Sequence, residues 1–235
     1  MSKNKLNRFH DIAVDPAPIF AEPVAFRYTV HLDDEFGEKG CYRSVINLLT
    51  DATENDSIIF LLNNHGGSMD VILPLINMLE VTQAHTVALC TGSQSSAATI
   101  FAMYCDEIVA LDFSAMMLHE VQTGHFGTMS NVSRDVDNTK QRNERLINEA
   151  YGGFLEPSEI EDLLRGVEIY LSDEEIRARA PKRKAWRDEF LLKKQQMQQD
   201  MLSAALEELG VNTNQDLDEE IVVEKPKSRS TRGKK

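Results

Sequence analysis

The sequence has few cysteines, no long apolar run and too few cations to balance its acids. Only three cysteines, Cys41, Cys90 and Cys105, occur in 235 residues. Their number is odd and each lies in or beside an apolar segment, so we expect three buried free thiols and no disulfide framework. No apolar run approaches the roughly 18 residues that a membrane span needs, and residues 1–20 lack a signal-peptide pattern. These absences predict a cytoplasmic protein with no membrane contact.

The charge balance is strongly acidic. Twenty-five Lys and Arg stand against 38 Asp and Glu, which gives a formal net charge of −13. A protein that coats nucleic acid needs clustered cations to hold phosphates, so we expect no nucleic-acid partner for the body of the chain. The exception is residues 225–235, which carry four Lys and two Arg and no acid. We interpret them as a solvated tail, with contact to nucleic acid or to an acidic partner surface as the alternative.

Length and composition predict one globular domain with appendages. A hydrophobic content of 42% with 27% charged residues is ordinary for a globular protein, and 235 residues are few for two full domains. Prolines interrupt residues 1–25, which we interpret as an extended N-terminal arm. We expect the globular domain over 26–181, an amphipathic C-terminal helix over 182–210, and a disordered tail over 211–235 that is first acidic and then basic.

Strands and helices alternate through the globular domain. Runs of apolar and β-branched residues predict strands at 26–32, 57–62, 85–90, 107–111, 115–118 and 168–171. Helical spacing or helix-start signals predict helices at 40–52, 69–82, 96–104, 128–150 and 158–165, a helix capped by Ser172, and another over 183–209. This alternation predicts an α/β fold with a mainly parallel sheet. The polar helix at 128–150 should project from the body.

A glycine pair follows the strand at 57–62, within the segment Asn63-Asn64-His65-Gly66-Gly67-Ser68. Adjacent glycines let the backbone approach a ligand or another chain closely, and the start of the next helix supplies N–H groups that point the same way. A plain tight turn is the alternative interpretation.

A serine-rich turn runs from Gly92 to Ala98 and opens the helix at 96–104. A serine at a strand-to-helix turn can expose its hydroxyl beside the next backbone N–H, which is how acyl-transfer sites pair a nucleophile with an oxyanion donor. The Gly-x-Ser-x-Gly elbow is absent, because Gln94 and Ala98 lie two residues before and after Ser96. A serine that only caps the helix is the alternative.

A histidine and a carboxylate lie at two further strand ends. A parallel strand at 115–118 would deliver His119 to the carboxyl edge of the sheet, where open α/β sheets bind ligands. Glu168 opens a later strand and can orient the imidazole as a triad carboxylate does. A structural histidine and a solvated glutamate are the alternatives. His119, Glu120 and His125 lack the spacing of a helical His-Glu-x-x-His metal site, so we expect no metal.

In this order the four segments resemble those of the ClpP family. Its members are the proteolytic subunits of the caseinolytic protease, and the family belongs to the crotonase-like superfamily. Asn63 to Ser68 resembles that family's Asn-Ser-Pro-Gly-Gly-Ser loop, and Gly92 to Ala97 resembles its Gly-Gln-Ala-Ala-Ser-Met turn. Met117 to His119 resembles its Met-Ile-His, and Leu171-Ser172 the end of its Phe-Leu-Ser run. The resemblance covers roughly residues 26–178.

The resemblance implies repeated ββα units with a projecting handle helix, followed in this chain by a C-terminal helix and tail. It implies a serine endopeptidase with Ser96 as nucleophile, His119 as general base and Glu168 as orienting acid. The backbone N–H groups of Gly67 and Ala97 would form the oxyanion hole. It further implies polypeptide substrates, no cofactor, a homo-oligomeric ring that is stacked through the handle helices, and an AAA+ ATPase unfoldase as a partner.

The sequence also departs from the family pattern. Glu168 stands where the family usually has Asp, Asn64-His65 replace Ser-Pro, and Ala97-Ala98 replace Met-Gly. After Ser172 the family's ending is replaced by a long extra helix and tail. Such divergence suits a phage or mobile-element relative as well as a cellular one. It leaves two alternative functions: a catalytically silent structural or regulatory subunit, and a crotonase-type enzyme that acts on an acyl-thioester.

Overall fold

The computed structural model describes residues 25–208, and side chains up to residue 205. The predicted N-terminal arm and C-terminal tail therefore lie almost wholly outside the described residues. The chain divides into two units between Lys184 and Ala185, and each unit is described by itself. No helix among the described residues is both long enough and apolar enough to cross a membrane.

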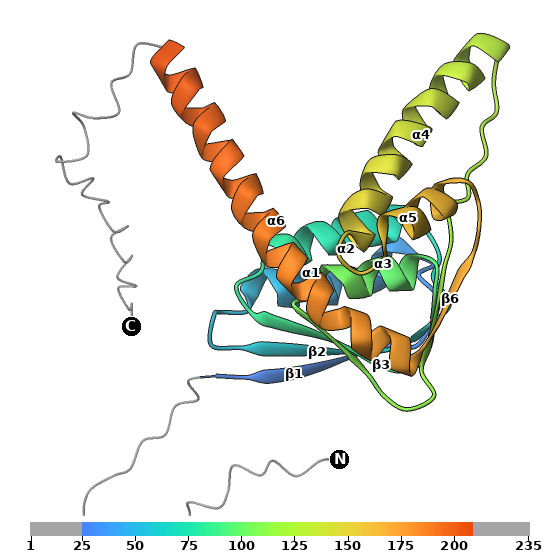
Figure 1. The fold of residues 1–235 in the computed structure, drawn as a ribbon. Helices are drawn as coiled ribbons and strands as arrows, with labels where there is room; N and C mark the ends of the chain where they lie inside the picture. Colours follow the sequence, from blue (N-terminus) through green and yellow to red (C-terminus); the bar gives the residue numbers. More distant parts are fainter. Residues whose placement is uncertain (1–24, 209–235) are drawn as a thin grey trace, which may run out of the picture. The chain divides into compact units, whose positions relative to one another are not determined.

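The first unit alternates strands and helices (Figure 1). Its elements in chain order are β1 (Arg27–Leu32), a 3₁₀ helix (Lys39–Tyr42), α1 (Arg43–Asp51), β2 (Ser57–Asn64), α2 (Met69–Val81), β3 (His85–Ser95), α3 (Ala97–Tyr104), β4 (Glu107–Ala110), β5 (Ala115–Leu118), α4 (Met129–Tyr151), α5 (Pro157–Leu164), β6 (Ile169–Ser172) and the start of α6 (Asp173–Glu208). The expectation of a mixed α/β fold is confirmed.

The sheet has six strands and is mostly parallel. β1, β2, β3 and β4 are neighbours in chain order, each parallel to the next, and β5 also pairs with β3 in parallel. Only β6, which pairs with β5, runs antiparallel. Right-handed crossovers between strands that advance in one direction place the connecting helices on one face. Figure 1 shows α1, α2 and α3 together on that face of the sheet.

β3 is longer than the sequence indicates, because Gly92 does not open a turn. Its first part pairs with β4 over Val87–Cys90, and its last part pairs with β5 over Ser93–Ser95. Gly92 lies between the two pairings and is packed against the side chain of Asn63, so a Cβ there would collide. The glycine therefore serves a close contact inside a strand. As a result, β3 extends to Ser95, and Ser96 is the single residue between the end of β3 and the start of α3.

The core lies between the sheet and the helices and is rich in aromatic contacts. Phe60 of β2 packs edge to face against Phe101 of α3, with ring centroids 5.0 Å apart, and Phe36 lies 6.0 Å from Phe101. Of the three cysteines, all free thiols, Cys90 and Cys105 are buried as expected. The expectation for Cys41 is wrong, because this thiol lies in the 3₁₀ helix, which buries none of its residues.

α4 leaves the body of the first unit along most of its length. Its buried residues begin only at Asn143 and continue with Ile147, Ala150 and Tyr151. Residues 129–142 are exposed or half-buried, and Figure 1 shows this part of the helix extending away from the sheet. The expected projecting helix is therefore present.

α6 is one continuous helix where the sequence suggested two. It contains Pro181, which cannot donate to the carbonyl of Arg177. Three arginines of its first part bind carbonyl groups of other segments in the first unit: Arg177 binds Ala110, Arg179 binds Phe154, and Arg183 binds both Met103 and Gly152. These contacts offset the cost of the proline.

In the second unit, α6 continues from Ala185 to Glu208. The rings of Trp186 and Phe190, one turn apart, stack with centroids 4.9 Å apart. Further along, large apolar side chains are exposed at Leu192, Met197, Met201 and Leu202.

Candidate active site

Ser96 stands at the junction of β3 and α3 in an unusual backbone conformation. It is the N-cap residue of α3, with φ 56° and ψ −128°, and it is one of only two residues other than glycine with positive φ among those described. Such a conformation costs about 1–3 kcal/mol and persists only where its surroundings hold it. One contact that holds this conformation is a hydrogen bond from the Ser96 N–H to the carbonyl of Met117, with a length of 2.8 Å. This bond ties the serine to β5.

The glycine pair fits into a space that no other residue could occupy. Gly66 has φ 100°, and a Cβ there would lie 2.7 Å from both the Ser95 carbonyl oxygen and the Ser96 Cβ. Gly67 has φ 135°, and a Cβ there would lie 2.5 Å from the Phe36 carbonyl oxygen. Both glycines are therefore required by close backbone contacts as well as by positive φ.

Phe36 holds the glycine loop from the other side. Its N–H donates to the Gly66 carbonyl at 2.7 Å, and its carbonyl accepts from the Ser68 N–H at 2.8 Å. Its side chain is fully buried. The loop is thus clamped between Phe36 and the Ser96 turn, and the sequence pattern gave no sign of the role of Phe36.

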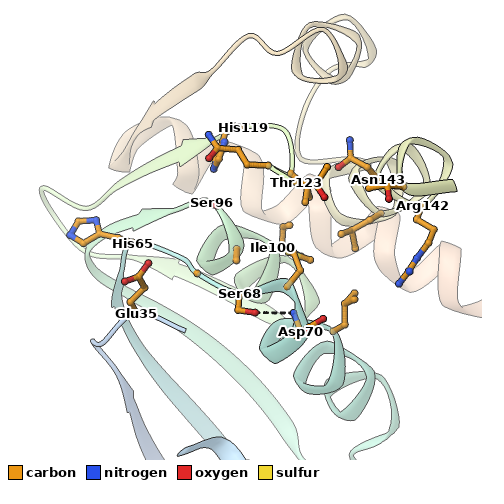
Figure 2. A pocket seen from close by; sticks show the side chains of 18 of the residues that line it. Glu35, His65, Ser68, Asp70, Ser96, Ile100, His119, Thr123, Arg142 and Asn143 are labelled. Carbon is orange, nitrogen blue, oxygen red and sulfur yellow. Dashed lines mark hydrogen bonds between the residues drawn. The ribbon is translucent and has the colours of Figure 1, made fainter. Parts of the chain in front are cut away.

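The predicted nucleophile, base and oxyanion donors share one cavity of about 650 Å³. Ser96, Ala97, Gly67 and His119 all line it, whereas Ser95 does not. Figure 2 shows Ser96 and His119 among the side chains that line this cavity. The apolar part of its wall is formed by Met69, Leu73, Ile100, Met117, Val121 and Leu146. The cavity therefore offers an apolar surface beside a group of hydrogen-bonding atoms.

Two N–H groups in the cavity wall remain available to a ligand. Within residues 25–208, neither the N–H of Gly67 nor that of Ala97 donates to a protein acceptor. Ala97 is the first residue of α3, so its N–H is one of those that a helix leaves without an internal partner. Such N–H groups suit a developing negative charge, which the helix N-terminus also favours.

His119 follows β5 directly and is half-buried. In the described part of the chain, no hydrogen bond joins its ring to Ser96 or to a carboxylate. Glu168 does not line the cavity; it is exposed, and its Oε2 accepts a hydrogen bond from the hydroxyl of Tyr170 at 2.6 Å. That bond and the carboxylate charge raise the pKa of Tyr170.

Continued by one residue beyond its last pair, the β5–β6 register would set Glu168 opposite His119. The ladder between β5 and β6 pairs Met117 with Tyr170 and Leu118 with Ile169. The next pair in this register would be His119 and Glu168. Because side chains alternate between the two faces of a sheet, both belong to the face of Met117 and Tyr170. Met117 lines the cavity.

α4 contributes polar residues to the cavity that the sequence motifs do not include. Thr139, Arg142 and Asn143 line it beside the apolar Leu146. The amide of Asn143 donates to Glu120 Oε1 at 3.2 Å, which joins α4 to the residue after His119. Thr139, Asn143 and Leu146 are spaced by four and then three residues, which puts them on one face of a helix. This spacing is the sequence feature that could have predicted their common location.

Charged groups surround the cavity unevenly. Asp70 in the first turn of α2 pairs with Lys39, with the charged atoms 3.0 Å apart. Glu35 and Arg142 also line the cavity, and Figure 2 shows them on opposite sides of it. Among residues 25–208, no group of three or more His, Cys, Asp or Glu side chains is arranged to hold a metal ion.

One comparison with known proteins gives a match. The sequence profile of the Clp protease family matches residues 27–156, more than half of the chain. The matched region begins with β1 and ends just before α5, so it includes Ser96 and His119 but not Glu168. No curated protein matches the sequence.

Proposed function

Because the chain belongs to the Clp protease family, whose members are typically serine peptidases, we propose that it cleaves polypeptides with Ser96 as the nucleophile. The observation that carries the proposal is the conformation of Ser96. Its backbone is held at positive φ where a strand meets a helix, and its side chain lies in one cavity with His119 and two available N–H groups. A serine that only caps a helix needs none of these.

In the proposed mechanism, the Ser96 hydroxyl oxygen attacks the carbonyl carbon of the scissile bond while His119 accepts its proton. The N–H groups of Gly67 and Ala97 hold the oxyanion of the tetrahedral intermediate. His119 then gives the proton to the leaving amine. In the second half of the reaction, His119 accepts a proton from water, the water oxygen attacks the acyl carbon, and Ser96 leaves with the proton that His119 returns.

Glu168 is the proposed orienting acid. The β5–β6 register supports this role, because one further pair beyond Leu118 and Ile169 would set Glu168 opposite His119 on the same face of the sheet. The role requires the carboxylate to turn from the Tyr170 hydroxyl to the imidazole, a change of side-chain rotamer on an exposed residue. Replacing Glu168 by Gln should then lower kcat at least about tenfold with little change in KM.

The first test is labelling with a fluorophosphonate probe, followed by intact-mass spectrometry. We expect one adduct on the wild-type chain and on Ser95→Ala, and none on Ser96→Ala. Ser95→Ala is the matched control, because Ser95 is the neighbouring hydroxyl and does not line the cavity. An adduct that survives in Ser96→Ala would remove Ser96 from the mechanism. Release of fluorescent peptides from an unfolded, labelled polypeptide then measures turnover.

Family membership also supports a polypeptide substrate and a homo-oligomeric ring, in which the projecting α4 is the proposed contact between stacked rings. Native mass spectrometry tests the assembly. A monomer at micromolar concentration would contradict it, whereas a defined multimer would leave only the number of subunits to be read from its mass.

One observation favours a second candidate function, a catalytically silent subunit of the same fold. The Glu168 carboxylate binds Tyr170, and the His119 ring has no carboxylate partner in residues 25–208. This candidate predicts a folded multimer that takes no fluorophosphonate adduct and that assembles with an active homologue. The labelling experiment therefore separates the two functions.

A further inference from the structure

The carbonyl group of Ser96 is held by a buried threonine. Thr99, in the first turn of α3, donates its hydroxyl to this carbonyl at 2.6 Å, and its backbone N–H donates to the same oxygen at 3.0 Å. The side chain of Thr99 has no exposed surface. The carbonyl of the half-buried Ser96 thus accepts two hydrogen bonds, and both come from one residue.

A second buried hydroxyl completes this arrangement. Tyr151, the last residue of α4, is fully buried, and its hydroxyl lies 2.7 Å from Thr99 Oγ1. Because Thr99 donates its one hydroxyl proton to the Ser96 carbonyl, Tyr151 must be the donor in the hydrogen bond between the two hydroxyl groups. Burial raises the pKa of Tyr151 well above its usual range, so the phenol keeps the proton that it donates.

Threonines in helices often bond to a carbonyl three or four residues earlier, which by itself indicates no special role. Here the contact does not end at Thr99. Tyr151 comes from another helix, 52 residues along the chain, and reaches the same hydroxyl. Through Thr99, α4 is therefore linked to the carbonyl of Ser96, whose backbone is held at positive φ beside the cavity.

The geometry of the peptide bond links this carbonyl to the proposed oxyanion hole. The C=O of Ser96 and the N–H of Ala97 belong to one peptide unit, which is planar. Fixing the direction of the carbonyl therefore fixes the direction of the N–H at the other end of the unit. The same constraint sets ψ of Ser96 at −128°.

We propose that Thr99 and Tyr151 are positioning residues that aim the Ala97 N–H at the oxyanion and hold the Ser96 turn. This inference rests on the proposed function, because it needs an acylation step to assist. Neither residue lines the cavity, so both act through the Ser96–Ala97 peptide unit and not on the substrate.

The test measures the rate of Ser96 acylation by a fluorophosphonate as a function of probe concentration. Thr99→Val keeps the shape of the side chain and removes the hydroxyl; we expect the maximal rate to fall about 10- to 100-fold, less than the loss of a whole oxyanion donor. The half-saturating probe concentration should not change, because probe binding does not use this contact. Thr99→Ser restores the hydroxyl and should return the rate to within about threefold of wild type.

Tyr151→Phe removes only the outer hydrogen bond and should slow acylation about 3- to 10-fold. The double variant Thr99→Val/Tyr151→Phe should react like Thr99→Val alone, because the tyrosine then has no hydroxyl to hold. Additive losses in the double variant would contradict a single chain of hydrogen bonds and overturn the inference.

Thr86→Val is the matched control. Thr86 is also fully buried, and its hydroxyl donates to Asp106 Oδ2 at 2.7 Å, but it lies at the opposite end of β3. This variant makes the same chemical change and should lower stability without changing the acylation rate of the folded protein. Equal slowing in Thr86→Val and Thr99→Val would overturn the inference, because general destabilisation would explain both.

The remaining outcomes separate the inference from the proposed function. Wild-type acylation rates in Thr99→Val would overturn the inference and leave the proposed function intact. An unreactive wild-type Ser96 would overturn both. If Thr99→Val fails to fold, Tyr151→Phe carries the test, because it keeps the buried ring, and a wild-type rate in that variant would overturn the inference.

Discussion

At the scale of single residues, the most constrained position beside the serine is Gly66. Its missing side chain leaves room for the backbone of Ser95 and Ala97 and for the Ser96 Cβ. The contact is with main-chain atoms, which cannot rotate away as the end of a long side chain can. The shape of the Ser96 turn therefore depends on the glycine loop as much as on its own residues.

Replacing Gly66 by Ala should destabilise the protein by at least about 2 kcal/mol, because alanine at φ 100° is strained and its Cβ meets Ser95 and Ser96 at 2.7 Å. It should also slow acylation of Ser96 at least about tenfold, since small displacements of reacting groups are costly. Urea unfolding and probe labelling measure the two effects. Gly40→Ala is the control, because a Cβ there meets nothing within 4 Å; equal effects in both variants would refute the explanation.

A second residue-scale feature is the buried carboxylate of Asp56, which ties β1 to the start of β2. Its Oδ1 accepts from the Phe26 N–H at 2.7 Å, and its Oδ2 accepts from the N–H and hydroxyl of Thr53 at 2.8 and 2.9 Å. The backbone N–H groups of Thr53 and Phe26, and then the Thr53 hydroxyl, lower the pKa of Asp56.

This lowered pKa makes part of the stability depend on pH. The folded protein favours the carboxylate, so the stabilisation is complete above the ordinary Asp pKa of about 3.9 and is lost as the pH falls through the lower folded pKa. In urea unfolding, Asp56→Asn should be less stable than wild type at pH 6, and the difference should shrink below about pH 4. Asp51→Asn, at the exposed end of α1, is the control and should change the urea midpoint little at either pH. A difference that is constant from pH 6 to pH 3 would refute the assignment.

The sequence predicted which residues of the site come together better than how their side chains lie. Strand-end positions were enough to place Gly67, Ser96, Ala97 and His119 near one another, because the carboxyl ends of parallel strands share an edge. The rotamer of Glu168 was not predictable, because it depends on a hydrogen bond to Tyr170. The burial of a side chain such as Cys41 likewise depends on which face of a short helix meets the core.

At the scale of elements, the first part of α6 is fastened to the body by arginines. Arg183, only 3% exposed, donates to the carbonyls of Met103 and Gly152, which lie at the C-terminal ends of α3 and α4. Helix C-terminal carbonyls have no partner inside their own helix, and a cation there also interacts well with the helix dipole. One side chain thus satisfies the ends of two helices.

Arg183→Met should therefore cost about 2–4 kcal/mol, because it keeps an unbranched apolar stem but removes the guanidinium, which leaves two buried carbonyls without this donor. Guanidinium unfolding measures the loss. Arg165→Met is the matched control, because within the described part of the chain Arg165 forms ion pairs only with Glu161 and Asp162, on the surface. The expected cost is below about 1 kcal/mol. Similar costs for the two variants would mean that the carbonyl contacts contribute little.

Element boundaries show where local patterns mislead. Gly92 was interpreted as the start of a turn, yet β3 continues through it. Glycine is needed there because a Cβ would collide with Asn63 on the neighbouring strand. Pro74 is the sixth residue of α2 and Pro181 lies inside α6, although proline disfavours the interior of a helix. For Gly92 and Pro181 tertiary contacts override local preference, and the spacing of apolar residues along the sequence does not reveal such contacts.

At the scale of the whole molecule, the folded unit is longer than the region that carries the family pattern. The family match ends at residue 156, but the first unit extends to Lys184. Buried residues of this extra part include Leu163, Leu171 and Ile176, and β6 completes the sheet beside β5. The extra residues are therefore part of the core.

A chain that ends at residue 156 should not fold, because it loses these buried side chains and β6, the strand that follows Glu168. A chain that ends at residue 184 keeps all of them and should show a cooperative urea transition. Near-ultraviolet circular dichroism and urea unfolding distinguish the two. Cooperative unfolding of the shorter chain would show that β6 and α6 are dispensable for the core.

The position of Arg183 in the chain also matters for biosynthesis. A ribosome adds residues at roughly 5–20 per second, so it needs roughly 1 to 5 s to pass from residue 156 to residue 183. During that interval the nascent chain already contains α3 and α4 but not the guanidinium that binds Met103 and Gly152 at their ends. These two helix ends therefore lack their arginine donor until the first part of α6 has been synthesised.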